Sequence, residues 1–435
     1  MTSRTAQIDE GNFSMRISSK LTAGLASAAV AAAGLAGASL GSAGSAQQPA
    51  NGAQAPANGA AAATNGVQAN GVQAPASDSA ALRQTRSAVR MNQIQTLGAH
   101  NAYHRELSAA EKQVQQAQDP NAQNIWYSHA SIPQQLQNQN IRTLELDLFP
   151  DPAGGLYTYP LIRKLTGQGP LTDPELAKPG IKVMHVVDFD YNTTCRSFVL
   201  CLQQVKTWSD QHPDHAPVTI QLELKQSDPR LVAAGGVQAP PWDLGNLNSI
   251  DTEIRSVFSE RQLLSPDDVR KPGLTLEQSV LTKGWPTLDQ ARGKVMFFFD
   301  NGGEGQIRDL YRTGKPNLEG RAVFTRGPEG QPDAAVTMVN DPRGANQAEI
   351  QRLVRKGYLV RTRSDEPMST VLNNETSRVG IALESGAQFV TTDFPVAGMA
   401  ARYDRDFVAQ LPGGVAVRCN PVSSPAWCRG NVSER

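Results

Sequence analysis

The sequence is poor in cysteine, in net charge and in long, strongly apolar runs. It has four cysteines in 435 residues and no Cys-x-x-Cys spacing, which argues against a disulfide scaffold and against a zinc site. Lys and Arg total 41 and Asp and Glu total 41. Because no bulk positive charge is available to hold a polyanion, we expect no nucleic-acid partner. No Gly-x-Gly-x-x-Gly follows the first strand-like run, which disfavours a dinucleotide-binding sheet.

The amino-terminal segment has the pattern of a secretory signal. Residues 22–46 are almost entirely Ala, Gly, Ser, Leu and Val, and they follow Arg16 and Lys20. This pattern predicts a signal peptide over residues 1–46, cleaved near Ala46, in a secreted or periplasmic protein. A membrane anchor is the alternative, but the run is weakly apolar and is broken by Ser and Gly.

A low-complexity segment follows. Residues 47–80 repeat Asn-Gly with Ala, Gln and Pro between, and nothing in them can form a core. We therefore expect a disordered linker there and one folded domain over residues 81–435. Translation starts at either Met1 or Met15, and the sequence leaves that choice open.

The cysteines fall into two close pairs, Cys195 with Cys201 and Cys419 with Cys428. Four cysteines allow three pairings, and two local bridges need the least rearrangement of the chain. An oxidising compartment favours such bridges over the alternative of four free buried thiols.

Eight strand-like runs recur after Met91, separated by stretches of helical character. The runs are residues 94–99, 142–149, 182–187, 218–225, 294–300, 335–340, 357–362 and 388–392. Helices are expected at residues 131–140, 197–210, 247–259, 345–356 and 377–385. This alternation predicts an α/β fold, a (β/α)8 TIM barrel, regular or distorted, with long loops. A doubly wound open sheet is the alternative, and the role of the long insertion at 226–286 stays open.

Four successive runs carry polar side chains at or near their carboxyl ends. These side chains are His100, Asn101, Glu145, Asp147, His185, Glu223 and Lys225. In a barrel, the carboxyl ends of the strands form the catalytic rim. Each residue alone has a plainer explanation, such as a structural histidine, an amphipathic strand, a helix cap or a surface salt bridge. The repetition in four consecutive runs favours the catalytic explanation.

The types of these residues indicate phosphoryl-transfer chemistry. The oxygen donors suit a hard cation such as calcium better than zinc, and they are Asn101, Glu145, Asp147 and Glu223. His100 and His185 remain as an acid–base pair. A metal, two imidazoles and the cation of Lys225 together can hold negative charge and move protons.

The ordered motifs resemble the phosphatidylinositol-specific phospholipase C superfamily, and within it the calcium-dependent bacterial enzymes of the Streptomyces type. The main motifs are His100-Asn101-Ala102-Tyr103, Leu144-Glu145-Leu146-Asp147, Val183-Met184-His185-Val186 and Leu222-Glu223-Leu224-Lys225. Later matches are Val360-Arg361-Thr362-Arg363-Ser364-Asp365 and Asp393-Phe394-Pro395. The likeness extends from Met91 to about Pro395.

The resemblance implies a role for each matching residue. His100 is the expected general base for the inositol 2-hydroxyl, which attacks phosphorus and expels diacylglycerol to leave an inositol 1,2-cyclic phosphate. His185 is expected to stabilise the phosphoryl oxygens and to help deliver a proton. The resemblance also implies calcium, bound by the four oxygen donors, where the metal-independent branch has an arginine. Lys225, Arg363 and Asp365 are expected to contact the substrate or to support residues that do.

We therefore expect a monomeric, exported, calcium-dependent phosphodiesterase acting on a phospholipid at a membrane surface. A glycerophosphodiester phosphodiesterase is one alternative, although that family usually has His-Arg where this chain has His100-Asn101. A non-catalytic exported barrel that binds head groups is the other, and the presence of both histidines disfavours it. The preferred head group and the fate of the cyclic product are not indicated.

Overall fold

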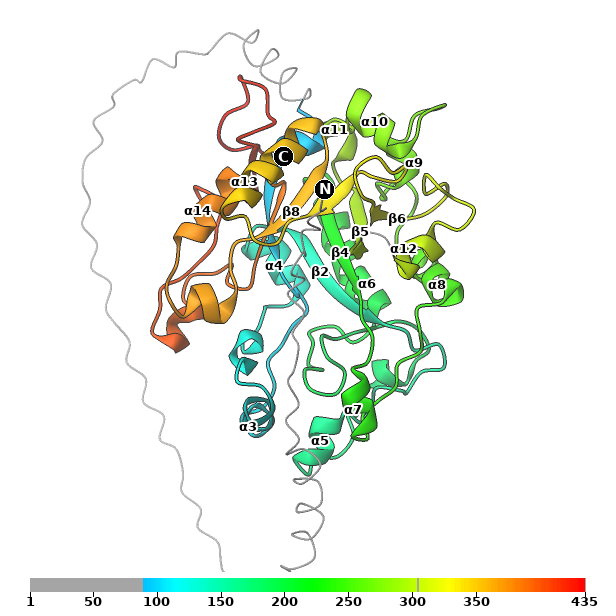
Figure 1. Ribbon diagram of the computed structural model, residues 1–435, viewed down its shortest axis with the longest axis vertical. Coiled ribbons are helices and arrows are strands. Elements are labelled where there is room, and N and C mark those ends of the chain that lie inside the picture. The colour runs from blue at the N-terminus through cyan, green and yellow to red at the C-terminus, as the bar shows by residue number, and fades with distance from the viewer. Residues whose placement is uncertain (1–88, 303–304, 435) are drawn as a thin grey trace, which may run out of the picture. The chain divides into compact units, whose positions relative to one another are not determined.

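The computed structural model describes residues 89–302 and 305–434 (Figure 1). These residues form a nearly closed barrel of eight parallel strands with helices between them, so the predicted TIM barrel is confirmed. The predicted signal peptide, the linker and residues 81–88 lie outside the described residues. Within the described part of the chain, no helix has the length and apolar character to cross a membrane.

The barrel strands are joined by parallel ladders in the order β6-β5-β4-β2-β1-β9-β8-β7. In chain order they are β1 (Ile94–Ala99), β2 (Ile141–Phe149), β4 (Val218–Leu224), β5 (Val295–Gly302), β6 (Val323–Arg326), β7 (Val336–Met338), β8 (Leu359–Arg363) and β9 (Phe389–Thr392). β6 and β7 lie next to each other without forming a ladder, which is why the barrel is nearly rather than fully closed. Outside the barrel order, the short strand β10 (Val417–Cys419) pairs antiparallel with β1.

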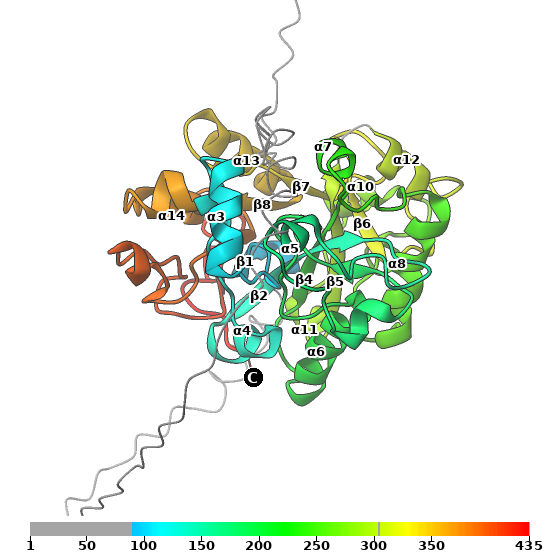
Figure 2. The ribbon, with the colours of Figure 1, turned by 90° about the horizontal axis from the view of Figure 1, so that it is seen from below.

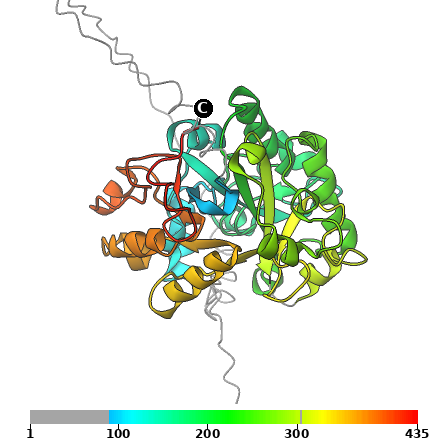
Figure 3. The ribbon, with the colours of Figure 1, turned by 90° about the horizontal axis from the view of Figure 1, so that it is seen from above.

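Helices surround the strands, as Figure 3 shows from one end of the barrel. The longer ones are α3 (Ala109–Gln118), α4 (Ile132–Asn138), α6 (Phe198–Gln211), α8 (Leu244–Val257), α10 (Leu276–Thr282), α13 (Ala345–Lys356) and α14 (Ser377–Glu384). The shorter ones are α5 (Leu161–Leu165), α7 (Pro229–Ala233), α9 (Pro266–Val269), α11 (Leu288–Ala291) and α12 (Gln306–Tyr311). The predicted helices are thus present, and residues 226–286 contain α7 to α10 joined by loops.

One predicted barrel strand is wrong, and one barrel strand was missed. Of residues 182–187 only β3 (Lys182–Val183) is a strand, and it pairs antiparallel with the end of β2. His185 therefore comes from a loop. The missing barrel strand is β6, which is only four residues long and ends in Arg326, so it carries no apolar run long enough to be recognised in the sequence.

Successive side chains of a barrel strand point alternately out toward the surrounding helices and into the barrel. On β2 the buried leucines belong to the main hydrophobic cluster, whereas Glu145 and Asp147 share the opposite face. Phe298 of β5 stacks on Phe389 of β9 with ring centroids 6.0 Å apart, although three strands separate β5 from β9 in the sheet order. Both rings therefore lie inside the barrel, where Phe298 is in register with Gln221 of β4 and, through it, with Glu145 of β2.

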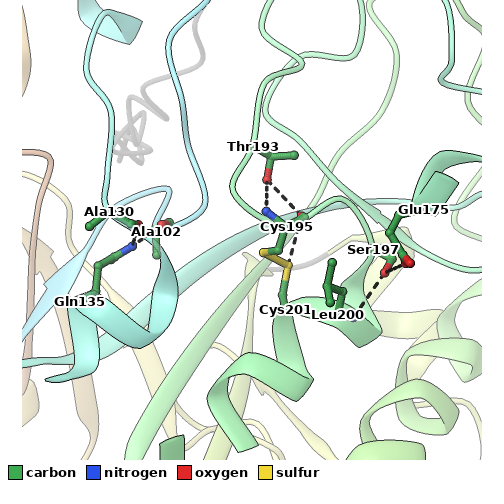
Figure 4. The surroundings of a disulfide bond; sticks show 9 residues. All are labelled: Ala102, Ala130, Gln135, Glu175, Thr193, Cys195, Ser197, Leu200 and Cys201. Atoms are coloured by element: carbon green, nitrogen blue, oxygen red, sulfur yellow. Dashed lines mark hydrogen bonds between the residues drawn. A yellow bond between two sulfur atoms is a disulfide. The ribbon is translucent and has the colours of Figure 1, made fainter. Parts of the chain in front are cut away.

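Both predicted local disulfides are present, Cys195–Cys201 and Cys419–Cys428. Figure 4 shows the first, which joins the segment before α6 to the first turn of that helix. The backbone N–H of Cys195 donates to the hydroxyl oxygen of Thr193, and that hydroxyl donates to the carbonyl of Cys195. The bridge therefore fixes the segment that leads from the His185 loop into α6.

Candidate active site

A cavity of about 410 Å³ opens at the carboxyl ends of the barrel strands. Six predicted site residues line it, namely His100, Asn101, His185, Glu223, Lys225 and Arg363. Figure 2 looks at the end of the barrel where α3, α5 and α7 gather, in the segments that follow β1, β2 and β4. The predicted rim is thus a real pocket built from distant parts of the chain.

His100 follows β1 and is held by a buried carboxylate. Its Nδ1 lies 2.6 Å from Oδ1 of Asp393, at the end of β9. Because a carboxylate accepts, Nδ1 carries the hydrogen and Nε2 keeps its lone pair. Burial, together with the charge of Arg363, lowers the pKa of His100 to about 3 and outweighs the opposite effect of Asp393. The imidazole is therefore neutral at pH 7 and able to accept a proton.

Asp393 is the main residue that the sequence analysis left without a role. Burial favours its neutral form, but the hydrogen bond from His100 and the charge of Arg363 hold the pKa of Asp393 below its usual range. The Nη2 of Arg363 donates to Asp393 Oδ2 at 3.0 Å. The signal was its place directly after the last strand, in a motif that had been noticed without a function.

Asp365 lies behind Asp393 and does not line the cavity. It is fully buried, its Oδ1 accepts from the backbone N–H of Asp393 at 3.1 Å, and its Oδ2 accepts from the hydroxyl of Thr392. Burial, followed by the charge of Asp393, raises the pKa of Asp365 to about 7. Of the two roles predicted for Asp365, the geometry favours support over substrate contact.

The three predicted carboxylate ligands come together because of strand register. β2 and β4 pair so that Asp147 lies opposite Glu223. One oxygen each from Glu145, Asp147 and Glu223 lies within 4.8 Å of the others. Lys225 lies between two of them, with Nζ 2.9 Å from Glu223 Oε1 and 3.3 Å from Asp147 Oδ2.

Asp147 is the least satisfied of these groups. Neither of its buried carboxylate oxygens has a hydrogen-bond partner among the described residues. Burial raises the pKa of Asp147 well above its usual value, and Lys225 offsets this only in part. A buried carboxylate without hydrogen bonds is costly unless a cation reaches it. Three carboxylates, with the amide of Asn101 lining the same cavity as Glu223, fit calcium, which prefers oxygen ligands.

Glu145 is held in place from both sides. Its Oε1 accepts from Gln221 Nε2 and its Oε2 accepts from Arg361 Nη2, each at 2.8 Å. Gln221 also donates to Asp300 Oδ2 at 3.1 Å, which extends the network to β5. Burial, only partly opposed by Arg361, raises the pKa of Glu145 to about 7. Gln221, Asp300 and Arg361 had no assigned role in the sequence analysis.

The amide of Asn101 is oriented by two tyrosines. Its Nδ2 donates to the hydroxyl oxygen of Tyr127 at 3.2 Å, and the hydroxyl of Tyr103 approaches its Oδ1 at 3.4 Å. The backbone of Asn101 has φ of 48°, in the left-handed region that asparagine tolerates better than most residues. This sharp turn directs the side chains of His100 and Asn101 into the same cavity.

His185 reaches the cavity from the loop after β3. Its Nδ1 lies 2.8 Å from Oδ2 of Asp190, and His104 Nε2 contacts the same oxygen at 2.8 Å. Neither His104 nor Asp190 was predicted as a site residue. His104 follows the His100-Asn101 motif by a few positions, but a single histidine gives no signal of its own.

Comparison with known proteins agrees with these observations. The family profile described as phosphoinositide phospholipase C, Ca2+-dependent, matches residues 89–421. The sequence matches no curated protein.

Two solved structures show the extent of the likeness. A calcium-dependent phosphoinositol-specific phospholipase C from a Pseudomonas species, in an apo form, is 18% identical, with a TM-score of 0.46 over 77% of this chain and 96% of that one. A Ca2+-dependent phosphatidylinositol-specific phospholipase C from Streptomyces antibioticus is 16% identical, with a TM-score of 0.44 over 71% of this chain and 96% of that one. Because the family profile covers the whole barrel, this chain belongs to the calcium-dependent phosphoinositide phospholipase C family of phosphodiesterases.

Proposed function

We propose that this protein is an exported, calcium-dependent phospholipase C that cleaves phosphatidylinositol-type lipids to diacylglycerol and inositol 1,2-cyclic phosphate. The observation that carries the proposal is the convergence of His100, His185 and Glu223 on one cavity, with Asp147 and Glu145 beside Glu223. The two disulfides support export, because such bridges persist in oxidising compartments.

His100 serves as the general base. Its Nε2 takes the proton of the inositol 2-hydroxyl as that oxygen attacks phosphorus. Asp393 fixes the tautomer and stabilises the imidazolium that forms, as its 2.6 Å contact with Nδ1 allows. A neutral imidazole at pH 7 suits this step, because the base must be unprotonated before it acts.

His185 serves as the general acid. The bond between phosphorus and the glycerol oxygen breaks, and His185, as the imidazolium that the anionic phosphate of the bound lipid favours, passes the proton of Nε2 to that oxygen, so that neutral diacylglycerol departs. Lys225 and Arg363 line the same cavity and supply positive charge near the phosphoryl oxygens. Asp365 supports Asp393 from behind.

Asn101, Glu145, Asp147 and Glu223 would hold the calcium ion. When bound, calcium lowers the pKa of the 2-hydroxyl and neutralises charge on the phosphate. Asp147, whose oxygens accept no hydrogen bond of normal geometry from the described residues, is the ligand on which binding depends most.

Phosphorus NMR of the products formed from phosphatidylinositol vesicles tests the proposal. With calcium we expect the resonance of a five-membered cyclic phosphate, and with excess chelator we expect none. His100→Ala should lower turnover by about two to four orders of magnitude, the usual contribution of a general base. His212→Ala is the matched control, because His212 stacks on Trp208 at the end of α6 and does not line the cavity. Unchanged turnover in His100→Ala, or full turnover in chelator, would contradict the proposal.

A further inference from the structure

A third histidine lies directly behind His185. His104 is completely buried, does not line the cavity, and has its ring centroid 6.1 Å from that of His185 in an edge-on arrangement. The two rings are joined by a single atom, because His104 Nε2 and His185 Nδ1 both lie 2.8 Å from Oδ2 of Asp190.

The partners of His104 determine its protonation. Its Nδ1 lies 3.0 Å from the backbone carbonyl of Tyr127, and its Nε2 faces the Asp190 carboxylate. A carbonyl and an ionised carboxylate only accept hydrogen bonds, so both ring nitrogens of His104 carry hydrogen. Burial opposes this charge, but Asp190 more than compensates and raises the pKa of His104 above its usual value. His104 and Asp190 therefore form a buried ion pair.

The same contacts define which nitrogen of His185 can transfer a proton. Because Asp190 accepts from His185 Nδ1, Nε2 carries a transferable proton only in the imidazolium form. Burial and the charge of Lys225 lower the pKa of His185, and the anionic phosphate of a bound substrate favours the charged form. Asp190 can hold this orientation only if its carboxylate does not rotate. Its other oxygen, Oδ1, has no hydrogen-bond partner among the described residues, so the donors on Oδ2 are what fix the carboxylate.

The backbone around His104 is well placed to serve as this anchor. The N–H of His104 donates to the carbonyl of Asn101 at 2.7 Å, and its carbonyl accepts from the N–H of His129 at 3.0 Å. On the facing segment the N–H of Thr194 donates to the carbonyl of Tyr103 at 2.8 Å, next to the bridged Cys195. His104 and Asp190 are thus carried by two adjacent segments that are tied to each other.

We propose that His104 is a positioning residue that acts through Asp190 to hold His185 in place for proton delivery to the leaving group. The inference rests on the function proposed above. In the step concerned, the bond from the inositol 2-oxygen to phosphorus forms and the bond to the glycerol oxygen breaks. The 2-hydroxyl proton passes to His100 Nε2, and the proton on His185 Nε2 passes to the glycerol oxygen. His104 keeps both of its own protons throughout.

The test compares two leaving groups. A glycerol alkoxide departs poorly without a proton, whereas 4-nitrophenolate departs without one. For His104→Gln, which keeps a donor but loses the charge, we expect kcat on phosphatidylinositol to fall by about 10- to 100-fold with KM unchanged. On an inositol phosphodiester of 4-nitrophenol we expect kcat to change by less than about threefold. Asp190→Asn should show the same selective loss, and it carries the test if His104→Gln does not fold.

Two reference variants give the comparison its meaning. His215→Gln also removes a buried histidine, one that bonds Ser209 and the carbonyl of Ala216, and should leave kcat on both substrates unchanged. His185→Ala should itself lose more activity on the lipid than on the nitrophenyl ester. An equal loss on both substrates in folded His104→Gln, or no loss on the lipid, overturns the role of His104. An equal loss in His185→Ala instead removes the acid role from the proposed function, and this inference with it.

Discussion

Two buried carboxylates in this barrel differ in how many hydrogen-bond and ion-pair partners they have. Asp333 and Asp147 are both completely buried. Asp333 accepts two hydrogen bonds from Arg308, at 2.9 and 2.6 Å, and one from the hydroxyl of Thr325, and it pairs with Arg312 at 3.2 Å. Asp147 pairs with the ammonium of Lys225 at 3.3 Å, and neither of its carboxylate oxygens has a hydrogen bond of normal geometry among the described residues. Protein groups therefore satisfy the carboxylate of Asp333, whereas the carboxylate of Asp147 still needs a cation.

The location of each group explains the difference. Asp333 precedes β7, Thr325 is on β6, and Arg308 is on α12, so this cluster joins the two strands that share no ladder. Asp147 is on β2, which pairs in parallel with β4 over six residues. Where backbone hydrogen bonds join two strands, as between β2 and β4, the fold can tolerate a carboxylate that lacks hydrogen-bond donors. At the boundary between β6 and β7, here called the seam, no ladder joins the strands, so side chains must bind each other.

The largest effect that separates the two carboxylates is expected for Asp147→Asn. The substitution keeps the shape of the side chain but removes its charge, so calcium loses a ligand that no protein group replaces. We expect kcat on phosphatidylinositol to fall by about three to four orders of magnitude, which corresponds to several kcal/mol of lost charge stabilisation. Added calcium should raise the Tm of the parent protein and leave the Tm of Asp147→Asn nearly unchanged, as measured by thermal melting over a calcium titration. Wild-type kcat in this variant would remove Asp147 from the metal site.

A smaller effect, on stability instead of rate, is expected for Asp333→Asn. The change leaves the guanidinium groups of the buried Arg308 and the partly buried Arg312 without this counter-charge, and we expect the free energy of unfolding to fall by about 3 kcal/mol. Urea unfolding measures this loss. At temperatures where the variant is folded, kcat should stay within about threefold of the parent. A large loss of kcat in folded Asp333→Asn would show that the seam contributes to the site and that the comparison is too simple.

Much of this fold and site follows from local sequence pattern. Glu145 and Asp147 alternate with leucines, so their shared face could be predicted from the period of a strand alone. Their meeting with Glu223 followed from the rule that the carboxyl ends of barrel strands form one rim. The disulfides followed from the short spacing of the cysteines.

The remaining features depend on contacts that span most of the chain. Asp393 contacts a histidine 293 residues away, and Arg361 contacts a carboxylate 216 residues away. Both residues had been noticed in motifs, but their partners depend on which strands become neighbours. β6 and the loop that carries His185 were misjudged, because a four-residue strand and a polar loop beside a two-residue strand have no distinct periodicity.

The smallest effect tests whether an arginine in the site has a different task from the arginines at the seam. Arg308 and Arg312 hold Asp333, whereas Arg363 lies beside both Asp393 and His100. Since a nearby cation disfavours the imidazolium, Arg363→Met should raise the pKa of His100, and the acid limb of the kcat/KM profile should move to higher pH by about one unit. Activity at pH 4 relative to pH 7 should therefore fall. Arg326→Met is the control, because Arg326 pairs with Asp300 and its charge is not among the influences on His100. If Arg363→Met lowered kcat/KM equally at all pH values, Arg363 would act on the substrate alone. The proposed difference between Arg363, which sets the pKa of His100, and the arginines that bind Asp333 would then be wrong.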